Sequence, residues 1–158
     1  MFRIKPYYFL VPIMAALTAI PVVAQNANFD PLNLARGFAR ADATVTGNTG
    51  GSFDLANNLS SRDYRGNACM GFGSRQPDHM MELAEDMAEL TLSIHSGGQD
   101  TTLVIQGPDL AKEFRCGDNG ASGEDAAIRD TDWKAGVYKI WVGSMNSENW
   151  RYRLSARE

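Results

Sequence analysis

Apolar residues recur at every second position over much of the chain after residue 43, and this period of two predicts β-strands. The run ELTLSIHS at 89–96 places its apolar residues on one face and its polar residues on the other. Similar short runs occupy 101–108 (TTLVIQGP), 136–144 (GVYKIWVGS) and 150–156 (WRYRLSA). Each run is bounded by Gly, Asn, Asp, Ser or Pro, as strands commonly are. The pattern therefore favours strands joined by turns.

One segment departs from this pattern, because MELAEDMAEL at 81–90 consists of residues that favour helices. The runs on either side leave only a few residues to spare, so we expect strand, turn and strand. Shorter strands are predicted around 43–46, 68–72, 79–83 and 113–116. Together these segments predict an all-β fold, an antiparallel β-sandwich or jelly roll of about seven to eight short strands.

The sandwich is predicted to form one domain, 43–158, whose length suits a single hydrophobic core. The residues before it are mixed in pattern, and Gly37 interrupts a short helical run there. We therefore expect an N-terminal arm or linker over 25–42.

The first 24 residues have the three parts of a secretory signal peptide. Arg3 and Lys5 carry the positive charge, an apolar stretch covers 7–23, and small residues precede a cleavage point after Ala24. The stretch is shorter than a membrane span and contains prolines. We expect this signal helix to be cleaved. The mature chain, from Gln25, would then be periplasmic or extracellular, with no stable membrane anchor.

The net charge of the chain limits the kinds of partner that we expect it to bind. The chain holds 15 basic and 19 acidic residues, a formal net charge of −4. Loss of Arg3 and Lys5 with the signal would leave 13 basic residues against 19 acidic ones, a net charge of −6. A protein of this charge has no electrostatic reason to bind nucleic acid or an anionic membrane. The expected partner is an unidentified extracellular or cell-envelope ligand.

The chain has two cysteines, Cys69 and Cys116, and both lie in the part expected to be exported. In an oxidising compartment a disulfide between them is the expected state, and two free thiols are the alternative. They are not in CxxC spacing, and two isolated cysteines cannot hold zinc unaided.

A glycine-rich loop, GNTGGS at 47–52, looks like the G-D-S-G-G-P nucleophile loop of trypsin-like peptidases. Thr49 would stand at the nucleophile, but threonine nucleophiles usually depend on a free N-terminal amine. His79 and His95 both follow the loop, against the order of trypsin-like triads. We therefore expect a mobile turn, a partly buried structural His79, a solvated His95, no catalytic residues and no enzyme activity. The alternative is a small serine or threonine peptidase-like protein.

The stretch CGDNGASGEDAAIRDTD at 116–132 is rich in glycine and in oxygen-bearing side chains, a composition that suits Ca²⁺. Asp118, Asn119 and Asp125 are the candidate metal ligands, although their spacing is not that of an EF-hand. The alternative is a solvated acidic loop. No other cofactor is expected.

Aromatic residues gather late in the chain, where they could form a face on which sugars stack. Trp141 is the candidate binding residue for a carbohydrate or cell-envelope ligand. The alternative is that aromatic residues at strand spacing pack in the core or across strands.

Several of these motifs resemble bacterial pre-peptidase C-terminal (PPC) domains, and small exported proteins of that type. The resemblance is carried by DTTL at 100–103, by Cys116 with Asp118, and by AGVYKIWVGS at 135–144. It implies a β-sandwich or jelly-roll accessory domain of the kind that accompanies secreted peptidases, with calcium bound in some related sandwiches. The chain departs from the pattern at Asn119, where relatives tend to show a second acid. We therefore expect an exported, non-enzymatic accessory or binding module of unknown ligand.

Overall fold

The computed structural model describes residues 26–108, 113–120 and 123–158, so the predicted signal peptide lies outside the described residues. The described residues form eleven strands and one short helix, and none of their helices is long and apolar enough to cross a membrane. In chain order the elements are β1 (Leu32–Leu34), β2 (Thr44–Asn48), β3 (Phe53–Asp54), α1 (Leu55–Asn58), β4 (Phe72–Gly73), β5 (His79–Leu83), β6 (Met87–His95), β7 (Thr101–Gln106), β8 (Phe114–Gly117), β9 (Ala127–Trp133), β10 (Gly136–Ser144) and β11 (Arg151–Arg157).

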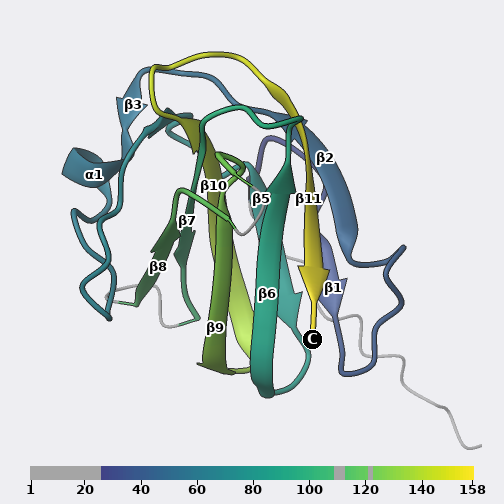
Figure 1. Ribbon diagram of the computed structural model, residues 1–158. Coiled ribbons are helices and arrows are strands. Elements are labelled where there is room, and N and C mark those ends of the chain that lie inside the picture. The colour runs from purple at the N-terminus through teal and green to yellow at the C-terminus, as the bar shows by residue number, and fades with distance from the viewer. Residues whose placement is uncertain (1–25, 109–112, 121–122) are drawn as a thin grey trace, which may run out of the picture.

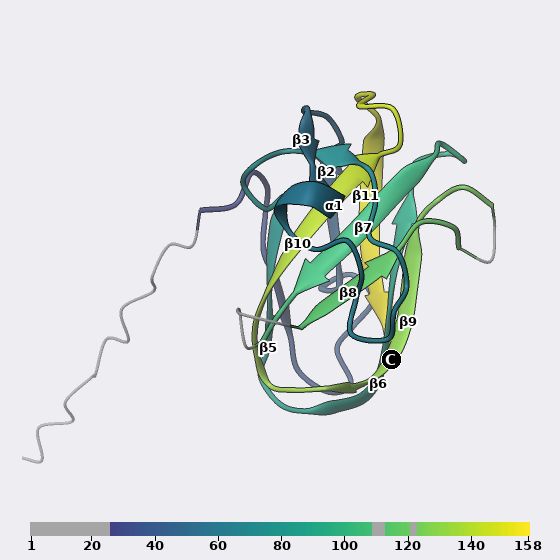
Figure 2. The same cartoon turned by 90° about the vertical axis from the view of Figure 1, so that its left-hand side faces the viewer.

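The strands form two sheets that pack face to face (Figure 1; Figure 2). In the seven-stranded sheet β10 pairs with β5, β4 and β7, and β1, β3 and β8 complete it. The four-stranded sheet has the order β2-β11-β6-β9. All strand pairs are antiparallel except β1 with β5. The predicted antiparallel β-sandwich is confirmed, with eleven strands where about seven to eight were expected.

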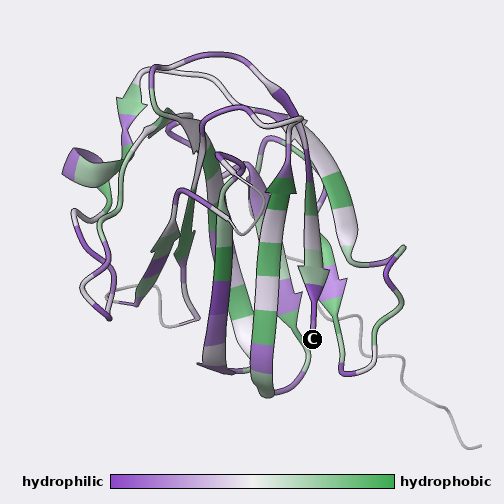
Figure 3. Cartoon of the chain, viewed as in Figure 1, coloured by the Kyte–Doolittle hydropathy of each residue, from purple (hydrophilic) through white to green (hydrophobic). Residues whose placement is uncertain are grey.

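The segment MELAEDMAEL forms strand, turn and strand, as the sequence predicts. Its apolar residues Met81, Leu83, Met87 and Leu90 are each exposed by 2% or less, so their burial between the sheets outweighs the helix propensity of their neighbours. Figure 3 shows the resulting alternation of apolar and polar residues along β6.

The predicted arm over 25–42 is wrong for its central residues, which form the edge strand β1 of the larger sheet. Leu32 pairs with Met81 and Leu34 with Leu83 in parallel register, and both leucines are buried in the core. Two apolar residues are too few for a recognisable period of two. The strand forms because β5 offers it hydrogen bonds and a place in the core.

The chain just before β1 is held in place by His79 on β5. His79 Nδ1 donates to the carbonyl oxygen of Asp30 at 2.8 Å, which leaves Nε2 to accept from the Tyr152 hydroxyl at 2.9 Å. The imidazole is 0% exposed, and burial lowers its pKa. His79 therefore links the N-terminal segment, β5 and β11, as a neutral structural residue.

Asp78 holds the same segment from the neighbouring position. Its carboxylate accepts hydrogen bonds from the Asn28 side chain at 3.0 Å and from the backbone N–H of Val142 at 2.8 Å. The side chain is 2% exposed, and burial raises the pKa of the Asp78 carboxyl to about 6, although the two hydrogen bonds act in the opposite direction. The folded state therefore binds this proton more tightly than the unfolded chain does.

We predict that Asp78→Asn removes a pH-dependent loss of stability. Because the folded pKa is raised, the wild type is favoured at low pH and loses stability as the pH rises from about 4 through 6. The neutral amide can still accept from Val142, so the variant should gain up to about 3 kcal/mol on the wild type between pH 4 and pH 8. Urea unfolding across this range checks it. His79 changes the stability with pH in the opposite direction, and it does so equally in both proteins. A difference in unfolding free energy between the two proteins that stays constant with pH would contradict the prediction.

A second, smaller core lies on the outer face of the seven-stranded sheet. Leu55 of α1 packs there with Val104, Phe114 and Trp141, and α1 lies on the viewer's side of this sheet in Figure 2. The predicted disulfide between Cys69 and Cys116 is confirmed and belongs to this cluster, with 5.1 Å between the two Cα atoms.

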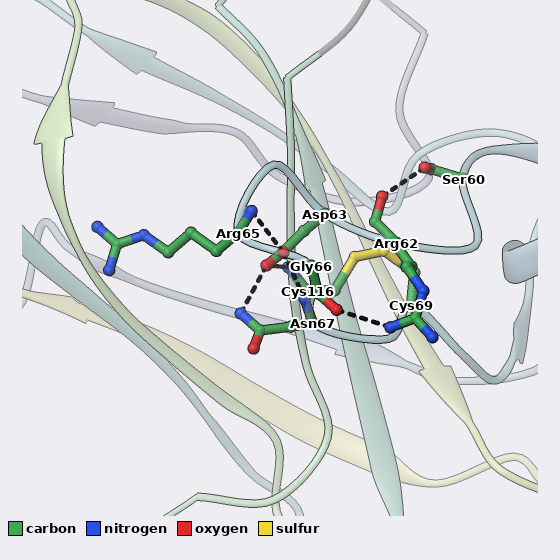
Figure 4. The surroundings of a disulfide bond; sticks show 8 residues. All are labelled: Ser60, Arg62, Asp63, Arg65, Gly66, Asn67, Cys69 and Cys116. Carbon is green, nitrogen blue, oxygen red and sulfur yellow. Dashed lines mark hydrogen bonds between the residues drawn. A yellow bond between two sulfur atoms is a disulfide. The ribbon is translucent and has the colours of Figure 1, made fainter.

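The loop before Cys69 is organised by Asp63, as Figure 4 shows. Its carboxylate accepts from the backbone N–H groups of Arg65 and Asn67 at 2.9 and 2.8 Å and from the Asn67 side chain at 2.9 Å. The disulfide then ties this loop to β8 at Cys116.

We predict that reduction of the disulfide lowers the melting temperature by roughly 10–20 °C, because the bridge closes a loop of 47 residues. Loop-closure entropy of that size corresponds to about 4 kcal/mol. Thermal unfolding with and without reductant, and of Cys69→Ala/Cys116→Ala, provides the measurement. A reduced protein that melts with the oxidised one would disprove it.

Candidate functional site

The GNTGGS loop is packed rather than mobile, which corrects the sequence prediction. Thr49 is 2% exposed; its hydroxyl donates to the carbonyl of Glu148 at 2.7 Å and accepts from the backbone N–H of Trp150 at 2.8 Å. A Cβ at Gly47 would lie 2.4 Å from the Tyr152 hydroxyl. The motif therefore fastens the end of β2 to the loop between β10 and β11.

Neither histidine contacts the Thr49 hydroxyl in the described part of the chain. The Thr49 hydroxyl bonds only to backbone groups among the described residues, and His79 is occupied by Asp30 and Tyr152. His95 is exposed at the end of β6, as expected, and its Nε2 lies 3.0 Å from the Ser155 hydroxyl. The described residues therefore form no nucleophile–base pair at the GNTGGS loop.

We predict that Thr49→Ala destabilises the fold by about 1–3 kcal/mol, since it removes two buried hydrogen bonds and leaves the Trp150 N–H unsatisfied. Thr49→Ser should recover most of this loss. Ser52→Ala, in the exposed part of the same loop, is the control and should lie within about 0.5 kcal/mol of the wild type. Chemical denaturation of the four proteins measures all three differences, and equal stabilities for Thr49→Ala and Ser52→Ala would refute it.

Trp141 is not available to a ligand, contrary to the prediction of a sugar-binding role. The indole is 3% exposed and belongs to the small core beside the disulfide. The alternation of apolar and polar residues cannot reveal this burial, because β10 is covered on both faces. Ile140 and Val142 face the main core, while Trp141 faces the cluster under α1.

Two of the three candidate calcium ligands, Asp118 and Asp125, have hydrogen-bond partners within the protein. Asp125 is committed to the loop between β6 and β7, where its carboxylate accepts from the Ser96 hydroxyl and backbone N–H and from the Gly98 N–H. Asp118 accepts a hydrogen bond from the backbone N–H of Asn119, and Asn119 is an exposed residue. Within the described ranges no group of three or more acidic, histidine or cysteine side chains is placed to hold a metal ion.

The second half of the predicted acidic loop is the strand β9, an edge of the four-stranded sheet. Its Asp130 turns inward and accepts from Arg115 Nε of β8 at 3.0 Å and from the Tyr64 hydroxyl at 2.7 Å, and it pairs with Arg65. The Arg115 guanidinium also lies 4.3 Å over the Trp133 ring. This buried cluster joins the edge strands of the two sheets.

The outer face of the four-stranded sheet carries a groove of about 1060 Å³; this sheet lies toward the viewer in Figure 1. Four arginines line it, Arg40, Arg129, Arg153 and Arg157, and the only carboxylate among its lining residues is Asp125. Because Asp125 is already engaged by the β6–β7 loop, positive charge dominates the groove.

Strand register explains the shape of the groove. Ser155 of β11 lies opposite Thr44 of β2 and Ser93 of β6, and Ser93 lies opposite Ala127 of β9. Since paired residues of an antiparallel sheet share a face, these four form a row of small side chains across all four strands. This row is the floor of the groove.

Larger residues flank the floor on both sides. On one side Arg153 lies opposite His95, and on the other Arg157 lies opposite Thr91, which in turn lies opposite Arg129. Adjacent outward positions along a strand are two residues apart, so each of these rows borders the floor directly. The groove thus has a hydroxyl-bearing floor between two banks that carry arginines.

Three of the four arginines have no partner among the residues that the structure describes. The guanidinium groups of Arg40, Arg153 and Arg157 make no ion pair or hydrogen bond within the part of the chain that the structure describes. Arg129 pairs with Glu89 at 2.9 Å, with its own side chain 72% exposed. An exposed pair of this kind is weak, and an anionic ligand can compete for the arginine.

Most of this site cannot be recognised from the sequence. The alternation in WRYRLSA places Arg153 and Ser155 on one face of a strand, but nothing in the sequence tells which strands lie beside it. Arg40 and Arg129 come from a predicted linker and a predicted acidic loop. The available signal was the set of arginines at 151, 153 and 157, which share one face of the predicted C-terminal strand in a chain that is acidic as a whole.

Comparisons with known proteins were made at the level of sequence and of structure. No protein-family model matches the chain, and no curated protein matches it in sequence. The pre-peptidase C-terminal domain of a collagenase from Bacillus anthracis is similar in structure, with a TM-score of 0.48 and 14% identity over 84% of this chain and 99% of that domain. A periplasmic inhibitor of g-type lysozyme from Aeromonas hydrophila is similar with a TM-score of 0.36 and 14% identity, over 80% of this chain and 96% of the inhibitor. The first is a domain of the type that the sequence resembles.

Proposed function

We propose that the chain is an exported, non-enzymatic binding module whose ligand is anionic and lies in the arginine-lined groove. The observation that carries this proposal is that Arg40, Arg153 and Arg157, on one face of an acidic protein, have no partner among the described residues. The disulfide between Cys69 and Cys116 supports export, because such bonds persist in oxidising compartments.

Electrostatics favours a ligand in this position. Arg153 and Arg157 lie on the same face of β11, and no carboxylate of the described residues pairs with either of them. Several other exposed basic side chains do meet carboxylates, as Arg36 meets Glu85 and Lys134 meets Asp86. A bound anion would supply the negative charge that the groove lacks.

The Ser155–His95 contact in the groove is the strongest argument for an enzyme, and it is incomplete. A serine nucleophile needs a base that a third group orients, and donors that stabilise an oxyanion. His95 has no carboxylate partner among the described residues. Ser155 lies in the middle of β11, between β2 and β6, so its backbone belongs to the sheet rather than to an oxyanion hole. These features support a binding role.

We predict that Arg153→Ser/Arg157→Ser weakens binding to an anionic support by roughly 2- to 30-fold, because each lost exposed contact is worth about 0.2–1 kcal/mol. Elution from a sulfonate resin along a salt gradient measures the change. Arg36→Ser/Arg75→Ser, which alters net charge equally but lies outside the groove, should elute with the wild type. Identical elution of all three proteins would refute the groove as the binding surface.

The same proteins test the absence of catalysis. A fluorophosphonate probe should not label the wild type, because Ser155 has neither an oriented base nor an oxyanion hole. Labelling that disappears in Ser155→Ala would overturn the non-enzymatic part of the proposal.

A further inference from the structure

We infer that the groove binds a linear acidic glycan, a sugar chain that carries carboxylate or sulfate groups. This inference rests on the proposed function, which names only an anionic ligand, and it adds the chemistry of the rest of that ligand. Three features carry it: free hydroxyl groups on and beside the floor, charges distributed along both banks, and lining residues without the aromatic side chains on which nucleic acids stack.

The hydroxyl groups of Thr91 and Ser93 are half-buried in the groove and make no hydrogen bond within the described ranges. Each can both donate and accept. The Ser155 hydroxyl beside them is held by His95 at 3.0 Å. Sugar hydroxyls have the same dual capacity, so a sugar ring on the floor can satisfy these groups while its acidic substituents reach the banks.

The spacing of the arginines indicates repeated charges on the ligand. Arg153 and Arg157 are four residues apart on β11, which corresponds to about 13 Å along the strand. Arg157 and Arg129 are separated by two strand spacings, or about 10 Å. Backbone positions this far apart suit a polymer with charges at intervals better than a single small anion.

Other polyanions fit less well. The groove has no Trp, Tyr or Phe among its lining residues, so it lacks the aromatic platforms on which single-stranded nucleic acids stack. An acidic peptide can bind an arginine cluster through its carboxylates, or it can add to a free strand edge. Strand addition is blocked at the centre of the groove, because β6 and β11 are paired on both sides. Binding through carboxylates alone would leave the hydroxyl groups of Thr91 and Ser93 without partners.

The test compares two variants on a panel of polymers by calorimetry. The polymers are alginate (carboxylate), dextran sulfate (sulfate), neutral dextran, poly-L-glutamate and oligo-dT. The floor variant is Thr91→Val/Ser93→Ala, which removes two hydroxyls and keeps all charges. The bank variant is Arg153→Ser/Arg157→Ser, and the melting temperature of each protein confirms that it is folded.

The wild type should bind alginate or dextran sulfate at least about 10-fold more tightly than poly-L-glutamate or oligo-dT, and should not bind dextran. The stronger of the two acidic glycans identifies the charged group. The floor variant should lose about 10-fold in affinity for that glycan with no change for poly-L-glutamate, because two hydrogen bonds are lost and no charge is.

Three results would overturn the inference. Poly-L-glutamate or oligo-dT bound as tightly as the acidic glycans would show that charge alone decides binding. A floor variant that binds the glycan like the wild type would show that the hydroxyls do not recognise sugar. Both results would leave the proposal of an anion-binding groove intact if the bank variant still binds the polymers more weakly than the wild type. Absence of binding to every polymer, together with unchanged elution of the bank variant from the resin, would overturn the proposed function as well.

Discussion

The buried ion pair between Arg115 and Asp130 is the constraint on which the four-stranded sheet depends. It joins β8 of one sheet to β9 of the other at the edge of the sandwich, and Tyr64 and Arg65 bring the disulfide-bonded loop to the same carboxylate. A buried ion pair is a costly device, because both charges lose their hydration, but loss of one partner is costlier still. The pair therefore specifies which residue of β9 turns inward, and with it the residues that turn outward.

That choice determines the groove. A shift of one residue in the register of a strand moves every side chain to the opposite face. With Asp130 turned inward, its neighbour Arg129 is turned outward, opposite Thr91 and in line with Arg157. The groove lies on sheet strands rather than on loops, so its arginines are spaced by the pleat of the sheet, and a site built on such elements is more sharply defined than one on a mobile segment.

The sequence predicts elements whose stability is local or compositional. The alternating runs identify β6, β7, β10 and β11, and two cysteines in a chain with a signal-like start predict the disulfide. The sequence does not predict the elements whose structure depends on contacts between residues far apart in the chain. β1 forms because β5 pairs with it, and β9 reads as an acidic loop because the arginine that neutralises Asp130 lies on another strand. The Thr49 hydroxyl looked exposed because its two backbone partners are about a hundred positions later in the chain.

Net charge describes the groove poorly, and the reason is general. Interactions between exposed charges are largely screened beyond about 8 Å at physiological ionic strength, so the net charge of −6 expected for the mature chain has little influence on a single groove. Within that distance the nearest side chains govern the potential, and here they are Arg40, Arg129, Arg153 and Arg157. The acidic remainder has a different consequence, because it opposes non-specific attachment to anionic surfaces. An anionic ligand of the kind we propose would therefore have to reach into the groove and contact the arginines directly, which favours an extended polymer over a broad charged surface.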